Sequence, residues 1–209
     1  MDEKNIRDFY DATAEAYAAG FINELDHKPF DRYLLKRFAE ENKNKGTIVD
    51  LGCGPGQTTK FLMDQGVKDI VGIDLSPKMV AQAVKHFPGI RFETGNMLSL
   101  DKADNSFGAV VAFYSIAHFK NKELVQFFSE IYRIIKAGGH LLFSFHVGDD
   151  VKTVDELLGV KASADFYFNQ VETIYDLLVA QRFTPIDTMT RYPYTEEFPS
   201  KRAYILAVK

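Results

Sequence analysis

Three glycines stand at every second position in the segment TIVDLGCGPGQTTKFL, residues 47–62. Gly52, Gly54 and Gly56 follow a short apolar run and precede a segment with helical character, with Cys53 between the first two. Glycine has no Cβ atom, so a glycine loop can approach a ligand closely, while the helix that follows offers free backbone N–H groups. The spacing predicts a ligand-binding loop between a strand and a helix.

Two common ligand loops do not match this one. A triphosphate-binding loop reads GxxxxGK[ST], but the first lysine after the glycines is Lys60, already inside the expected helix. A dinucleotide loop reads GxGxxG and would need its third glycine one position after Gly56. A nicotinamide-dependent oxidoreductase is therefore an alternative that the glycine spacing disfavours.

Acids and histidines follow the apolar runs that resemble strands. Asp74 ends the run DIVGIDL, 18 residues after Gly56, and an acid there can accept hydrogen bonds from both hydroxyls of a ribose. His118 and His146 each end a later run, where an imidazole can take up a proton. The alternative for each histidine is a hydrogen-bonded structural role.

The elements that would position these residues alternate between strand and helix patterns. Strands are expected at 47–51, 69–75, 90–96, 106–116 and 140–146, and helices at 58–66, 76–89 and 121–139. Alternation of this kind is typical of parallel strands joined by helical crossovers. In such a sheet, ligands bind at the carboxyl ends of the strands, where the glycine loop would lie.

The last sixty residues break the alternation. A helix pattern at 170–183 is followed by extended runs at 185–194 and 201–209 with no room for a helix between them, so these two strands must pair antiparallel. The expected fold class is α/β, a Rossmann-like doubly wound sheet. It is mostly parallel and seven-stranded, with an antiparallel C-terminal edge hairpin and helices on both faces.

Length and composition favour one soluble domain. The 209 residues are 46% hydrophobic with a net charge of −4, which gives no reason to expect a nucleic acid or membrane partner. Cys53 is the only cysteine, so no disulfide and no metal site are predicted, and a cytoplasmic location is expected. We divide residues 1–209 into an N-terminal helical cap (1–40), a cofactor-binding core (47–146) and an acceptor-side loop, helix and hairpin (147–209).

Five motifs together resemble a known family. They are VDLGCGPG (49–56), GIDLSPKMV (72–80), ETGNMLSL (93–100), FGAVVAFYSIAHF (107–119) and IYRIIKAGGHLLFSF (131–145). Their order is similar to that of the class I S-adenosylmethionine-dependent methyltransferases, over roughly residues 9–146. The resemblance implies S-adenosyl-L-methionine as cofactor, S-adenosyl-L-homocysteine as product and methyl transfer to a small molecule by in-line displacement.

The resemblance also assigns residues to the cofactor. Asp74 would bind the ribose, and Asn96 the adenine, where the family usually has an acid. The full set is Tyr17, Asp50, Gly52, Cys53, Gly54, Gly56, Asp74, Leu75, Met79, Asn96, Met97 and Phe113. Two further departures from the family pattern are Gly108, where an acid often stands, and Ala137, where proline is preferred.

The acceptor side is assigned more loosely. His146 and His118 are the candidate catalytic residues, and Tyr10, Arg191 and Tyr194 the candidate acceptor-binding residues. Arg191 has the alternative of pairing with a glutamate of the same hairpin. The target atom, the acceptor and the oligomeric state are not predicted, and a non-catalytic S-adenosylmethionine-binding protein remains a second alternative.

Overall fold

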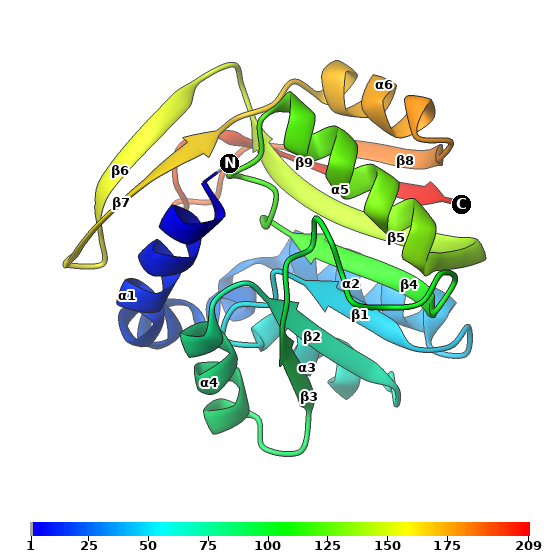
Figure 1. The fold of residues 1–209 in the computed structure, drawn as a ribbon, viewed down its shortest axis with the longest axis horizontal. Helices are drawn as coiled ribbons and strands as arrows, with labels where there is room; N and C mark the ends of the chain where they lie inside the picture. The colour runs from blue at the N-terminus through cyan, green and yellow to red at the C-terminus, as the bar shows by residue number, and fades with distance from the viewer. Residues whose placement is uncertain (1) are drawn as a thin grey trace.

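Seven strands form the central sheet of the computed structural model, which describes residues 2–209 (Figure 1). They are β1 (Ile48–Leu51), β2 (Ile70–Asp74), β3 (Arg91–Thr94), β4 (Phe107–Phe113), β5 (Ile135–Val147), β8 (Thr184–Arg191) and β9 (Lys201–Val208). Their order is β3-β2-β1-β4-β5-β9-β8; the first five are parallel, and β9 runs antiparallel to β5 and β8. The predicted fold class is confirmed.

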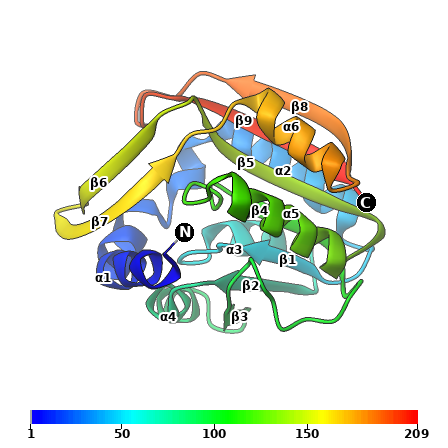
Figure 2. The same cartoon turned by 45° about the horizontal axis from the view of Figure 1, so that its top comes forward.

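Helices lie on both faces of this sheet (Figure 2). They are α1 (Glu3–Phe21), a 3₁₀ turn (Glu24–His27), α2 (Pro29–Asn42), α3 (Gln57–Asp64), α4 (Pro77–His86), α5 (Asn121–Ile134) and α6 (Val171–Ala180). Side chains of α5 and α6 pack on one face, while α2 and α3 pack on the other. The helix α4 lies against β2, β3 and α1.

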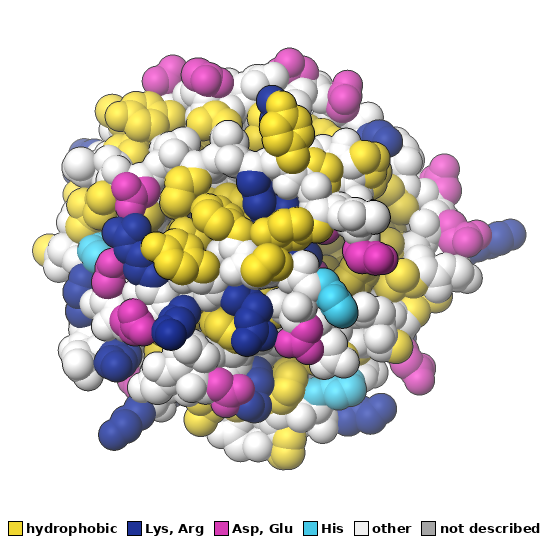
Figure 3. Space-filling view, turned by 180° about the vertical axis from the view of Figure 1, so that it is seen from behind, with side chains coloured by type: hydrophobic (Ala, Val, Ile, Leu, Met, Phe, Trp, Pro, Cys, Tyr) yellow, Lys and Arg dark blue, Asp and Glu magenta, His cyan; other side chains and the backbone are white. Residues whose placement is uncertain are grey.

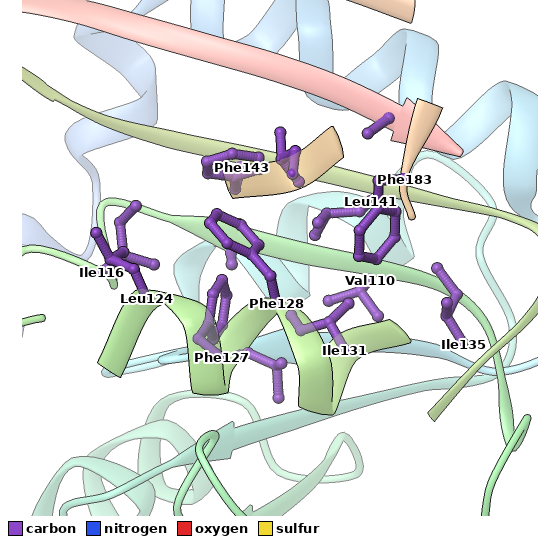
Figure 4. Close-up of a cluster of buried hydrophobic side chains, with 14 of the residues drawn as sticks. Val110, Ile116, Leu124, Phe127, Phe128, Ile131, Ile135, Leu141, Phe143 and Phe183 are labelled. Atoms are coloured by element: carbon purple, nitrogen blue, oxygen red, sulfur yellow. The ribbon is translucent and has the colours of Figure 1, made fainter. Parts of the chain in front are cut away.

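The largest hydrophobic core lies between α5 and the strands beneath it. Leu124, Phe127, Phe128 and Ile131 recur at helical spacing and are fully buried, pointing toward β4 and β5 (Figure 4). Burial of each such side chain contributes about 1.5–3 kcal/mol. This packing holds β4 and β5 rigidly, and the chain that follows each of them reaches the carboxyl edge of the sheet.

The parallel register brings the ends of β1, β2 and β4 to one edge. Leu51 pairs with Ile73, and Asp50 with Val111, so the glycine loop after β1 lies between the ends of its two neighbours. The Gly52 N–H donates to the Ile73 carbonyl at 2.8 Å and fixes the start of the loop on β2. This edge is where the ligand site was predicted.

The helix predicted over 121–139 ends earlier, at Ile134, and β5 begins directly after it. Phe107 pairs with Ile135 and Ala109 with His140, so the intervening residues bulge out of the strand pair. Gly138 takes a left-handed backbone there (φ 72°). The prediction was wrong in this segment because KAGG forms a bulge within the strand and does not end a helix.

A second sheet of two strands was missed. The antiparallel strands β6 (Val151–Leu157) and β7 (Val160–Tyr167) occupy the segment that we expected to be a loop. Leu158 and Gly159 make the turn with φ angles of 53° and 79°. Such a turn normally carries Asn-Gly or Asp-Gly, and leucine in the first position hid the hairpin.

The helix α1 packs on this hairpin and not on the main sheet. Ile6 and Phe9 of α1 form a small separate core with Ala164, Val154 and Phe166 of the hairpin. We call α1 and the β6–β7 hairpin together the cap. The N-terminal helical cap predicted over 1–40 also includes α2, which packs on the sheet as core.

The face that carries α2 and α3 shows hydrophobic side chains gathered among interspersed basic and acidic ones (Figure 3). Exposed apolar residues on these two helices include Tyr33 and Met63. Within residues 2–209, no helix combines the length and the apolar character that crossing a membrane requires.

Gly108 of β4 packs closely against Lys45, in the segment that precedes β1. A substitution at Gly108 tests this packing. A Cβ atom on Gly108 would press on the Lys45 carbonyl, 2.6 Å from its carbon, and backbone cannot move aside easily. We expect Gly108→Ala to lower the free energy of unfolding by about 1–3 kcal/mol, measured by urea denaturation. Gly20→Ala is the control, because its Cβ would meet only the flexible end of Leu158 at 3.3 Å.

Candidate cofactor and acceptor site

One large cavity opens at the carboxyl edge of the sheet. Its volume is about 770 Å³, within the range of about 300–1,000 Å³ that is usual for small-molecule sites. Most of the predicted site residues line it: Tyr10, Tyr17, Asp50, Gly52, Cys53, Gly54, Asp74, Leu75, Met79, Asn96, Met97, Phe113, His118, His146 and Tyr194. Gly56 and Arg191 do not line it.

The three glycines of the loop have different reasons to be glycine. A Cβ atom on Gly52 would collide with Ser115, and one on Gly56 would lie 2.7 Å from the Phe92 ring. At Gly54 the space is open, and the nearest atom is Cε1 of Tyr17 at 4.0 Å. Gly52 and Gly56 therefore serve close packing, whereas Gly54 leaves room in the cavity itself.

Asp74 fastens the glycine loop to the start of α4. Its carboxylate accepts the N–H of Gly54 and the N–H of Ser76, each at 2.8 Å. Burial raises the pKa of Asp74 to about 6, although these hydrogen bonds oppose the rise. Its role in binding ribose stays a prediction, and the structure adds the role of ordering the loop.

Asp50 lies beneath the loop and is fully buried. It accepts a hydrogen bond from the Thr59 hydroxyl at 2.6 Å, which connects β1 to α3. Burial, with a smaller contribution from the nearby Asp74 charge, raises the pKa of Asp50 to about 7. Cys53 is buried between these acids, and burial raises the pKa of its thiol well above the ordinary value.

Two cofactor-side residues contact the cap. The Asn96 amide donates to the Glu3 carboxylate at 2.9 Å, while its oxygen accepts the Leu98 N–H. Ser76, which caps α4 by accepting the Met79 N–H, donates its hydroxyl hydrogen to Asp11 at 2.5 Å. In this conformation α1 therefore lies over the predicted adenosine end of the cavity.

His118 is held from two sides. Its Nδ1 lies 2.7 Å from the Asp165 carbonyl of β7, which can only accept, so the proton is on Nδ1 and Nε2 accepts from the Tyr10 hydroxyl at 2.9 Å. Burial lowers the pKa of His118 to about 4. The imidazole is thus neutral near pH 7, and its Nε2 is hydrogen-bonded to Tyr10 of the cap.

His146 is also neutral near pH 7, but only one of its ring nitrogens forms a hydrogen bond to a described residue. Its Nδ1 contacts the Ser200 hydroxyl at 2.7 Å, and its ring stacks on Phe168 with centroids 5.4 Å apart. Burial, together with the charges of Arg202 and Lys28, lowers the pKa of His146 to about 4. No hydrogen bond to its Nε2 is formed by the residues that the structure describes.

Arg191 pairs with a glutamate of its own hairpin. This pairing was the alternative that we gave to a role in binding the acceptor. Its guanidinium binds both carboxylate oxygens of Glu197 at 2.6 and 2.8 Å and donates to the Tyr204 hydroxyl. Tyr204 in turn bonds the buried Asp31. Tyr194 lines the cavity, and its hydroxyl accepts the Phe30 N–H at 3.2 Å.

Sequence reasoning missed several residues of the cavity wall. Tyr114, just after β4, has a left-handed backbone (φ 55°) that is rare for a bulky side chain. Gln57, Glu24 and Lys28 also line the cavity. Gln57 directly follows the glycine loop, which is a signal that could have been used, whereas nothing in the local pattern marks the other three.

The comparisons with known proteins agree with this geometry. A family described as "Methyltransferase domain" matches residues 48–139, which run from β1 into β5. The demethylmenaquinone methyltransferase of Chlorobaculum parvum is 30% identical over 141 residues, 65% of this chain. Residues 48–139 are thus similar to a methyltransferase domain. The aligned part covers only 57% of that relative's length.

Solved structures share the fold of this chain over nearly its whole length. Magnesium protoporphyrin IX methyltransferase from Synechocystis, with bound S-adenosylmethionine, has a TM-score of 0.76 at 18% identity and covers 100% of this chain and 97% of its own. The [4+2]-cyclase SpnF has a TM-score of 0.74 at 18% identity and covers 99% and 96%. At this identity the likeness concerns the fold.

The residues of the cavity fit S-adenosylmethionine, the cofactor that the resemblance implies. Gly54 leaves open space, and the Asp74 carboxylate borders the cavity at the end of β2. Leu75, Met79 and Met97 supply apolar walls beside them, as an adenine ring requires. When bound, S-adenosylmethionine would supply an electrophilic methyl group on a sulfonium.

A side chain at Gly54 would fill space that the cofactor needs. We expect Gly54→Val to reduce S-adenosylmethionine binding below detection in calorimetry, because the branched side chain enters the cavity and disfavours the left-handed backbone (φ 53°). Circular dichroism should still report a folded chain. Retained binding would mean that Gly54 serves only the turn.

The affinity for S-adenosylmethionine should depend on pH through Asp74. The ribose hydroxyls bind the ionised carboxylate better than the protonated one, so binding favours proton release, and affinity falls as the pH drops below about 6. Asp74→Asn keeps an acceptor for the Gly54 N–H, and we expect it to weaken binding about tenfold at pH 7.

Calorimetry between pH 5 and 7 tests this expectation. The wild-type dissociation constant should rise toward pH 5, and the Asp74→Asn variant should show a smaller rise. Equal pH profiles for the two proteins would remove Asp74 from the ribose site. Any dependence left in the variant would be assigned to Asp50, whose pKa is about 7.

Proposed function

We propose that this protein transfers the methyl group of S-adenosylmethionine to a small-molecule acceptor. The observation that carries the proposal is that one cavity of about 770 Å³ contains both the glycine loop with Asp74 and, farther along, an aromatic wall with two histidines. Cofactor and acceptor can therefore meet within a single cavity. The relative from Chlorobaculum parvum is named for a small-molecule acceptor, demethylmenaquinone, which supports this class of acceptor.

The chain's own part in the reaction is mainly to orient the reactants and exclude water. Methyl transfer from a sulfonium is an in-line displacement, so aligning the acceptor atom, the methyl carbon and the sulfur supplies most of the rate enhancement. The cap covers the cavity through Tyr10 and Tyr17, which both line it. Their aromatic faces can also stabilise a nearby cation.

A proton must leave an acceptor that is a hydroxyl, an acidic carbon or a protonated amine. His146 suits this role better than His118, because the Nε2 of His118 already accepts from Tyr10. With Nδ1 of His146 donating to Ser200, its Nε2 can accept the acceptor's proton. A neutral imidazole also adds no positive charge beside the sulfonium.

Binding and turnover measurements test the proposed function. We expect calorimetry to detect S-adenosylmethionine and S-adenosylhomocysteine but not NAD, and mass spectrometry to detect S-adenosylhomocysteine formed with a member of a small-molecule acceptor panel. His146→Asn should slow turnover at least tenfold while cofactor affinity stays within about twofold. Tight NAD binding would favour an oxidoreductase. Cofactor binding without turnover on any acceptor would favour a non-catalytic binding protein.

A further inference from the structure

The charged side chains in the cavity wall are mostly acidic. Within residues 2–209 the wall contains six carboxylates and two lysine or arginine side chains: Glu24, Asp31, Asp50, Asp74, Glu196, Glu197, Lys28 and Arg202. An excess of acids in a cleft attracts cations and repels anions. The charge that an acceptor can carry therefore depends on which of these groups already have a partner.

Both basic groups are already paired with carboxylates. Lys28 Nζ donates to Oε2 of Glu24 at 2.5 Å and lies 3.9 Å from Glu197. The Arg202 side chain is 4% exposed, lies 3.6 Å from Glu197 and donates to the Phe198 carbonyl. An anionic acceptor would have to draw one of these cations away from a carboxylate and leave that carboxylate unpaired, which is costly.

Two acids beyond the glycine loop are paired with Arg191. The guanidinium binds both oxygens of Glu197, at 2.6 and 2.8 Å, and Glu197 also accepts the Tyr194 N–H at 2.8 Å. Although burial opposes it, these hydrogen bonds and the Arg202 charge lower the pKa of Glu197 to about 2. The fully buried Asp31 lies 3.4 Å from the same guanidinium. Both carboxylates therefore have a cation of the protein beside them.

Glu196 differs from its neighbour Glu197. It is exposed and lines the cavity, but its side chain forms no hydrogen bond or ion pair with any residue that the structure describes. The backbone around it is held in place, because the Glu197 N–H donates to the Tyr194 carbonyl at 3.0 Å and the Tyr194 hydroxyl accepts the Phe30 N–H at 3.2 Å. Glu196 thus presents a free carboxylate from a fixed segment of the wall.

Aromatic residues flank Glu196 in the chain. Tyr194 and Phe198, two positions to either side of it, both line the cavity. Each ring already contacts one cation of the protein: Arg191 Cζ lies 4.1 Å from the Tyr194 centroid, and Lys152 Nζ lies 4.5 Å from the Phe198 centroid. An aromatic ring has two faces, and either can attract an ammonium group within about 6 Å. A free carboxylate with aromatic neighbours suits a protonated amine.

We propose that the methyl acceptor carries a positively charged amine group, which pairs with Glu196 beside the rings of Tyr194 and Phe198. This inference rests on the proposed function and names the chemical class of its acceptor. Glu196 determines specificity, because it accepts hydrogen bonds from the ammonium group and orients the acceptor in the cavity. The amine is the group that is recognised, whichever atom of the acceptor takes the methyl.

Three probes that share a phenyl ring and a short chain give the test. Phenethylamine, phenethyl alcohol and hydrocinnamate are cationic, neutral and anionic near pH 7. With S-adenosylhomocysteine bound to the protein, we expect NMR titrations to show the amine binding at least about tenfold more tightly than the carboxylate. This preference should shrink as sodium chloride is added, because salt screens the charge of Glu196.

A variant assigns the preference to one residue. We expect Glu196→Gln to weaken amine binding about fivefold and to leave S-adenosylhomocysteine affinity within about twofold of wild type. Glu172→Gln is the matched control and should change neither, because Glu172 is an exposed glutamate of α6 outside the cavity.

The outcomes separate this inference from the proposed function. Equal affinity for the amine and the carboxylate overturns the inference, and so does the failure of every probe to bind. An amine affinity that Glu196→Gln leaves unchanged overturns the role of Glu196. A wild-type protein that does not bind S-adenosylhomocysteine contradicts the proposed function instead.

Discussion

The hydrogen bonds to the Asp74 carboxylate are the interaction on which the rest of the site depends. One oxygen accepts from Gly54 in the loop after β1, and the other accepts from Ser76 at the start of α4. Ser76 also caps α4 and binds Asp11 of α1. A single buried carboxylate thus connects the ends of two strands, a helix and the cap, and it is itself stabilised in its charged form by those connections.

The cap is fastened differently on its two sides. At the cavity it is held by polar contacts, from Glu3 to Asn96 and Asp11 to Ser76 at the predicted cofactor end, and from Tyr10 to His118. Toward the hairpin it is held by an apolar core. Polar contacts at a cavity edge exchange with water at little net cost, whereas separating an apolar core does not. The contacts between α1 and the hairpin are therefore harder to separate than the polar contacts at the cavity edge.

Much of the fold was accessible from the sequence because strand and helix signals there are local. The β1 and β2 runs, the Ser76–Pro77 helix start and the C-terminal strand pair were all found as predicted. The glycine loop and Asp74 could be placed together because parallel strands bring their carboxyl ends to one edge. Those predictions needed only the spacing of the motif residues and the alternation of strand and helix patterns along the sequence.

What could not be predicted depends on contacts between distant residues. The hairpin escaped because Leu158 takes a turn position that usually signals itself by asparagine or aspartate. A glutamate of its own hairpin could be predicted as a partner of Arg191, but only the geometry identifies that glutamate as Glu197.

The separate core of the cap has a consequence for folding order. Phe9 packs against Phe166 with ring centroids 6.0 Å apart, so this part of the cap core joins residues far apart in the sequence and cannot form until β7 has been made. Contacts across so many residues are slow to form because a long loop must close first. The ligand cavity would then remain open to solvent until late in folding, which leaves time for a cofactor to enter before the wall is complete.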